Sequence, residues 1–116
     1  MRVLSIKLHN FRSYDLFEAT FSERGTVIVG PNGTGKTNLL EAVYVSLRGT
    51  SFRGSLIDCM SHDSDQTNIL LETTDQTRRI QFLRENQRIS KTFSVNDHKS
   101  KILSPKNRLP VVLFEP

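Results

Sequence analysis

Eight consecutive residues, at positions 30–37, carry the clearest chemistry in this chain of 116 residues. They read Gly-Pro-Asn-Gly-Thr-Gly-Lys-Thr and match the phosphate-loop pattern G-x-x-x-x-G-K-[ST] at every fixed position. The three glycines let the backbone turn successive N–H groups inward around a phosphate. Lys36 adds a charge for the β- and γ-phosphates, and the Thr37 hydroxyl is placed to hold Mg²⁺. The expected nucleotide ligands are Gly30, Pro31, Asn32, Gly33, Thr34, Gly35, Lys36 and Thr37.

The segments on either side of this loop are those that a nucleotide site requires. Residues 26–29 form a short β-branched run between two glycines, which predicts a buried strand. Residues 38–47 predict a helix whose apolar face consists of Leu39, Leu40, Val43 and Leu47. The order of strand, glycine-rich loop and helix therefore places an anion at a helix N-terminus, where unpaired N–H groups favour it.

Size and composition indicate one globular domain, with 36% hydrophobic and 24% charged residues. Cys59 is the single cysteine, which excludes a disulfide within the chain and favours a reducing compartment. No apolar run approaches the length of a membrane span, and the N-terminus lacks the apolar segment of a signal peptide. We therefore expect a cytoplasmic protein that does not enter the membrane.

Positive charge is concentrated in one third of the chain. Nine of the 16 Lys and Arg residues lie between positions 78 and 108, where only Glu85 and Asp97 oppose them. Such a concentration suits a surface that binds a polyanion. The alternative is a set of charged edge strands that prevents aggregation. The candidate contacts with such a polyanion are Arg78, Arg79, Arg84, Arg88, Lys91, Lys99 and Lys101.

Most of the remaining sequence predicts strands. Two of them precede the phosphate loop and form an antiparallel hairpin, because only a short turn joins them. Residues 56–60 predict one short helical turn. The expected strands are residues 2–9, 16–21, 67–73, 77–84, 91–95 and 111–114.

Four segments of the chain together resemble the ATPase head of the RecF family, within the SMC-like group of ABC ATPases. They are residues 10–14 (Asn-Phe-Arg-Ser-Tyr), 30–44, 51–53 (Ser-Phe-Arg) and 109–116. The resemblance implies an α/β fold of the P-loop NTPase class, with a mixed sheet, one phosphate-loop helix and an antiparallel β subdomain. It also implies that residues 1–116 are a single partial domain, the first lobe of a head whose second lobe is absent.

The same resemblance implies a function in DNA replication, recombinational repair and the SOS response. Its cofactors would be ATP and Mg²⁺, and Arg12 would lie close to the nucleotide phosphates. Arg53 would face phosphate, DNA or a partner, or be an ordinary surface arginine. The implied partners are single-stranded or gapped DNA, RecR- and RecO-type mediators, and a second copy in an ATP-dependent homodimer.

Two catalytic motifs of this family are absent from the sequence. There is no S-G-G-Q-like signature, and no convincing Walker B strand ends in the acids that ATP hydrolysis requires. We therefore expect a chain that contacts nucleotide without completing a catalytic site. The alternative is a self-contained small P-loop protein or kinase with Glu72 or Glu115 on the metal, since each follows an apolar run. A further alternative is a basic β-rich DNA-binding module that no longer binds nucleotide.

Overall fold

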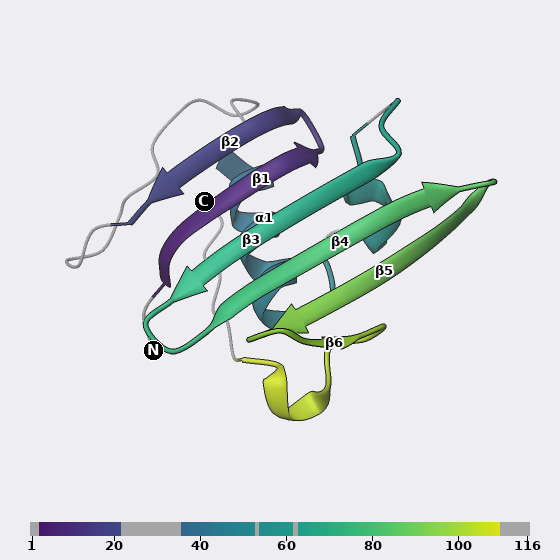
Figure 1. Ribbon diagram of the computed structural model, residues 1–116. Coiled ribbons are helices and arrows are strands. Elements are labelled where there is room, and N and C mark those ends of the chain that lie inside the picture. The colour runs from purple at the N-terminus through teal and green to yellow at the C-terminus, as the bar shows by residue number, and fades with distance from the viewer. Residues whose placement is uncertain (1–2, 22–35, 53, 62, 110–116) are drawn as a thin grey trace.

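The computed structural model describes residues 3–21, 36–52, 54–61 and 63–109 of the chain. In this part of the chain, one antiparallel sheet is covered on one face by a single α-helix, which lies behind the strands in Figure 1. The opposite face of the sheet is turned toward the viewer and has no helix over it. We call it the open face.

The sheet has six strands in the order β2-β1-β3-β4-β5-β6, and all neighbours pair antiparallel. The single crossover is the one from β2 to β3, which contains the α-helix. The strands are β1 (Val3–Phe11), β2 (Tyr14–Thr20), β3 (Gln66–Thr73), β4 (Thr77–Glu85), β5 (Arg88–Val95) and β6 (His98–Ser100). The helices are α1 (Lys36–Arg48) and two short 3₁₀ turns, η1 (Leu56–Cys59) and η2 (Pro105–Asn107).

Alternation of side chains along the strands decides which face α1 covers. The buried apolar residues of the central strands recur at every second position and pack under α1. They are Ile6 and Leu8 on β1, Ile69 and Leu71 on β3, Ile80 and Phe82 on β4, and Phe93 on β5. The residues between them, such as Lys7, Leu70 and Arg79, lie on the open face, where they are paired across neighbouring strands.

The helix expected from the sequence is confirmed, but its buried face is rotated from the expected one. Leu39 and Leu47 of the expected face are buried, together with Ala42 and Val45, whereas Leu40 and Val43 are only partly buried. A prediction from the apolar residues alone misses this rotation, because α1 also buries the charged residue Glu41. Gly49 ends the helix with a φ of 79°, in the left-handed conformation that favours glycine.

Five expected strands, at residues 2–9, 16–21, 67–73, 77–84 and 91–95, are confirmed within a few residues, and β6 is an addition that the sequence did not predict. The hairpin of β1 and β2 is also confirmed. The predicted strands at 26–29 and 111–114 lie outside the described residues, as does Glu115.

The described strands disfavour the kinase alternative. A kinase-like fold requires strands that alternate with helices, whereas β3, β4, β5 and β6 follow one another as antiparallel neighbours. Glu72 is exposed and alternates with the buried Leu71, so its carboxylate lies on the open face. It therefore points away from α1 and cannot hold a metal at the start of that helix.

Candidate functional site

The site is built on the turn between β1 and β2, at Arg12 and Ser13. The backbone N–H of Arg12 donates to the Cys59 carbonyl at 2.8 Å, and the Arg12 carbonyl accepts from the Ser61 hydroxyl at 2.5 Å. The carbonyl of Asn10 accepts from the backbone N–H of Ser61 at 3.0 Å. Both Asn10 and Arg12 have positive φ, 54° and 47°. The end of η1 and Ser61 therefore hold this turn in a conformation that is costly for residues with a side chain.

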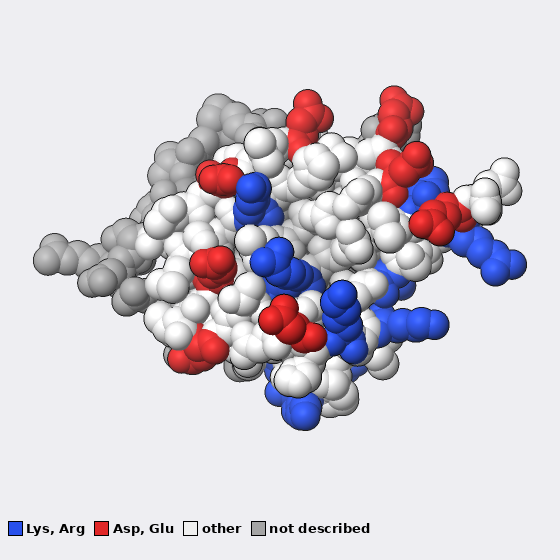
Figure 2. Space-filling model, viewed as in Figure 1, with Lys and Arg blue, Asp and Glu red and all other residues white. Residues whose placement is uncertain are grey.

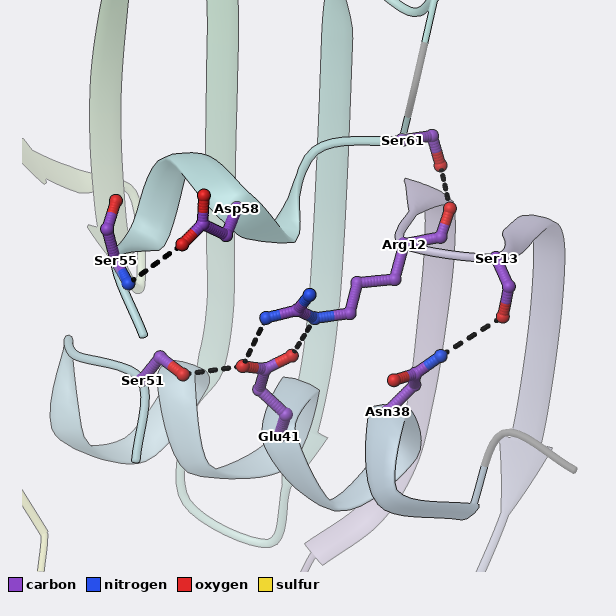
Figure 3. A network of polar contacts seen from close by, with 8 residues as sticks. All are labelled: Arg12, Ser13, Asn38, Glu41, Ser51, Ser55, Asp58 and Ser61. Carbon is purple, nitrogen blue, oxygen red and sulfur yellow. Dashed lines mark hydrogen bonds and ion pairs between the residues drawn. The ribbon is translucent and has the colours of Figure 1, made fainter. Parts of the chain in front are cut away.

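From this turn the Arg12 side chain runs along α1 to Glu41, as Figure 3 shows. Its Nε and Nη2 atoms donate to the two carboxylate oxygens of Glu41, with a distance of 3.0 Å from Nη2 to Oε2. The hydroxyl of Ser51, in the loop after α1, donates to the same Oε2 at 2.5 Å. We call Arg12, Glu41 and Ser51 the arginine clamp. It joins three segments that are distant in the sequence.

Burial makes this ion pair costly to break. The Glu41 side chain is fully buried, and that of Arg12 is 24% exposed. A buried carboxylate left without its cation typically costs about 3 to 5 kcal/mol. The hydrogen bonds with Glu41 raise the pKa of the Arg12 guanidinium above its usual value, so Arg12 stays charged near neutral pH. The arginine clamp is therefore a fixed part of the fold.

A second contact joins the same turn to α1. The side-chain amide of Asn38 donates to the hydroxyl of Ser13 at 3.0 Å. Asn38 and Glu41 are three residues apart, so both lie on the helix face that is turned toward the hairpin. The first two turns of α1 are thus attached to the β1–β2 turn at two points.

The phosphate loop itself lies largely outside the described residues, which leave out Gly30, Pro31, Asn32, Gly33, Thr34 and Gly35. The structure does place the helix start at Lys36, within the phosphate-loop motif and two residues before the expected helix of residues 38–47. None of the four residues in the first turn of α1 is acidic. An anion at this helix N-terminus would therefore meet no opposing carboxylate from the turn itself.

One of the expected DNA contacts is inside the protein. Arg78 is 1% exposed and donates to the carbonyls of Ser46 and Asn107, at 3.0 and 2.7 Å, and to the Gln76 side chain at 2.9 Å. Burial lowers the pKa of its guanidinium. The expectation that Arg78 lies on a binding surface is wrong, because its position on β4 alternates toward α1.

The other six expected contacts are spread over the molecule. Arg79 and Lys99 lie on the open face, Arg88 is exposed at the start of β5 beside the β4–β5 turn, and Lys101 is exposed after β6. Arg84 is half-buried and donates to the Ser64 carbonyl at 3.2 Å. Lys91 is half-buried opposite Phe82.

Basic and acidic side chains are interspersed on the open face, as Figure 2 shows. The basic residues of positions 78–108 are therefore distributed over several parts of the sheet and do not form one basic surface.

Sequence reasoning identified Arg12 but missed Glu41 and Ser51. A signal for Glu41 was present, because it is the only acidic residue in the 13-residue helix and lies between Leu40 and Ala42. A lone carboxylate in an apolar helix segment indicates a buried partner. Ser51 gave no signal, because its contact with Glu41 depends on the path of the loop after α1.

The described residues were also compared with the requirements of a metal site and of a membrane-spanning helix. Within the described ranges, no three His, Cys, Asp or Glu side chains are close enough together to hold a metal ion. None of the helices in the described part is both long and apolar enough to cross a membrane.

Comparison with known proteins assigns the family. Residues 5–112 match a family described as an AAA domain. The chain belongs to this AAA-domain family. Its resemblance to the RecF ATPase head, expected from the sequence, is also confirmed.

Relatives of this AAA-domain chain include proteins named DNA replication and repair protein RecF. That of Desulforamulus reducens is 41% identical over the whole chain, and that of Chlamydia caviae is 51% identical over 46% of it. The chain spans less than a third of the length of these relatives, 31% and 14% respectively. A solved structure of the recombination mediator RecF with ATP, in the RecFOR pathway, aligns with a TM-score of 0.70 and 31% identity. That alignment covers 86% of this chain and 28% of the solved one.

Proposed function

We propose that this chain is the ATP-binding lobe of a RecF-like protein of DNA replication and recombinational repair. The observation that carries the proposal is the start of α1 at Lys36, within the complete phosphate-loop sequence of residues 30–37 and without an acidic residue in its first turn. In the proposed site, backbone N–H groups of residues 30–35 surround the β-phosphate, and Lys36 neutralises the phosphate charge. Thr37 supplies a hydroxyl to Mg²⁺. The likeness to a RecF structure solved with ATP supports the choice of nucleotide.

For the longer protein, the proposal includes DNA, an ATP-dependent homodimer and mediator proteins of the RecR and RecO type as partners. It also places the protein in the cytoplasm. The names of the relatives, which mention DNA repair and the RecFOR pathway, support the DNA and mediator parts of the proposal. Among the described residues, Lys7, Arg79 and Lys99 lie on the open face, and their contacts with a DNA backbone would be independent of sequence and sensitive to salt.

Titration calorimetry of the 116-residue chain with ATP, with and without Mg²⁺, tests the nucleotide site. We expect saturable binding with one ATP per chain. Lys36→Ala should weaken it at least tenfold under both conditions, because the lost charge faces the phosphates. Thr37→Ala should instead remove most of the gain in affinity that Mg²⁺ provides. Lys7→Ala is the matched control, because it removes an exposed lysine from the open face and should leave binding unchanged.

The proposal fails if the parent chain binds no ATP. It also fails if Lys36→Ala binds as tightly as the parent, because the ligand would then bind outside the phosphate loop.

A further inference from the structure

A small surface patch that combines positive charge with one apolar side chain lies where the chain leaves β6 and passes through η2. It consists of the exposed residues Lys101, Ile102, Lys106 and Arg108, and we call it the basic corner. We propose that the basic corner binds an extended acidic segment of a partner protein, in which carboxylates flank an apolar side chain.

The basic corner lies far from the proposed nucleotide site. Leu103 is buried against Gly49, and the backbone N–H of Leu109 donates to the Leu47 carbonyl at 2.9 Å, so this part of the chain is attached to the C-terminal end of α1. The 13 residues of α1 span about 20 Å, and the nucleotide is proposed to bind at the other end, at Lys36. The inference is therefore independent of the proposed function.

The first argument is that this region carries charge of a single sign. Residues 98–109 include four Lys or Arg residues and no Asp or Glu. In the described part of the chain, no carboxylate forms an ion pair with a cation of the basic corner. Figure 2 shows basic side chains gathered at its lower edge, over the place that η2 takes in Figure 1. The basic corner therefore attracts a negatively charged partner.

The second argument is the exposure of Ile102, which is 66% exposed beside these cations. The turn that carries it is held by hydrogen bonds. The Ser100 hydroxyl donates to the Ile102 carbonyl at 2.6 Å, and Nε of Arg108 donates to the Leu103 carbonyl at 3.0 Å. Since Leu103 anchors the turn in the core, Ile102 is presented to solvent at a fixed position, where an apolar group of a partner can remove it from water.

The combination of both features selects among negatively charged partners. A DNA backbone offers phosphate and sugar groups, which would pair with the cations but leave Ile102 without an apolar partner. A folded partner protein typically contributes about 20 to 30 residues on each side of its interface, far more than the basic corner provides. An extended segment with carboxylates on both sides of a leucine or phenylalanine matches the cations and Ile102 together.

Fluorescence anisotropy with the 116-residue chain tests this inference. The probes are two short fluorescein-labelled peptides rich in Asp and Glu, one with Leu-Phe at its centre and the other with Ser-Ser. We expect saturable binding of the Leu-Phe peptide, about tenfold tighter than that of the Ser-Ser peptide, because the apolar pair covers Ile102. Added salt should weaken both peptides, because both also pair with the cations.

Substitutions separate the two contributions. Ile102→Ser should abolish the difference between the peptides, and the double change Lys101→Gln with Lys106→Gln should weaken both by about fivefold or more. The matched controls are Leu16→Ser and Lys7→Gln, because Leu16 is 64% exposed on β2 and Lys7 is exposed on β1; neither should alter binding. Circular dichroism checks that each variant is folded, and Ile102→Ala serves in place of Ile102→Ser if the latter does not fold.

Three results would overturn the inference. The first is absence of saturable peptide binding by the parent chain. The second is equal affinity for the two peptides, which would reduce the basic corner to a non-specific anion surface. The third is displacement of the Leu-Phe peptide by oligothymidine that binds more tightly at the same salt concentration, which would assign the corner to nucleic acid. ATP binding is measured separately, so each of these results leaves the proposed nucleotide site intact.

Discussion

Replacement of Arg78 by alanine should be among the most destabilising single changes in this protein. Its guanidinium donates at 3.0 Å to the carbonyl of Ser46, in the last turn of α1, where no following helical N–H can reach. It also donates at 2.7 Å to the carbonyl of Asn107. A buried carbonyl left unsatisfied costs about 1 to 3 kcal/mol, and the emptied volume adds a cavity term. The expected loss is about 3 to 5 kcal/mol in the free energy of unfolding. Removal of the buried charge of Arg78 is favourable, but it offsets only part of this loss.

Urea unfolding followed by far-ultraviolet circular dichroism measures this loss, and Arg79→Ala is the control. Arg79 is the next residue in β4, but it is exposed on the open face, so its replacement should change stability by no more than about 0.5 kcal/mol. Arg78→Lys should fall between the two, because an ammonium keeps the charge but cannot reach both carbonyls. A loss in Arg78→Ala no larger than that in Arg79→Ala would refute the assignment of Arg78 as the C-terminal cap of α1.

Three further changes test other parts of the fold. Gly49→Ala should lower the free energy of unfolding by about 1 to 3 kcal/mol, because φ is 79° and the new Cβ would lie 2.8 Å from Cβ of Leu103. Gly54→Ala should cost much less, because Gly54 does not have the positive φ of Gly49; equal losses would contradict this reasoning. Gln87→Gly should raise stability by about 0.5 kcal/mol, measured by urea unfolding, because Gln87 has a φ of 67° in the two-residue β4–β5 turn. Burial raises the pKa of the Tyr14 phenol above 10.0, so the unfolded chain ionises first and stability falls as pH rises past 10. Tyr14→Phe should lose less stability between pH 9 and 11, and an unchanged pH profile would contradict this.

The sequence predicted the regular elements because their signals are local. Alternation of apolar and polar residues located the strands, and the glycine-rich loop located the start of α1 to within two residues. Family resemblance supplied the class of fold, which periodicity alone does not distinguish from other sheets covered by one helix. The short β6 was missed because its three residues carry no apolar alternation and pair only with the end of β5.

The polar contacts were harder to predict because they depend on tertiary register. Arg78 and Arg79 are adjacent and equally basic in the sequence, but alternation along β4 buries one and exposes the other. The choice between the two faces was set by Ile80 and Phe82, which share the face of Arg78. A count of charges along the chain could not separate them, so the predicted basic surface was larger than the one that the fold presents.

The central claim is that ATP binds at the start of α1. A crystal structure of this chain with Mg²⁺ and a non-hydrolysable ATP analogue tests it most directly. We expect the triphosphate within residues 30–37 and the Thr37 hydroxyl toward the metal. A nucleotide bound elsewhere on the chain would contradict the account.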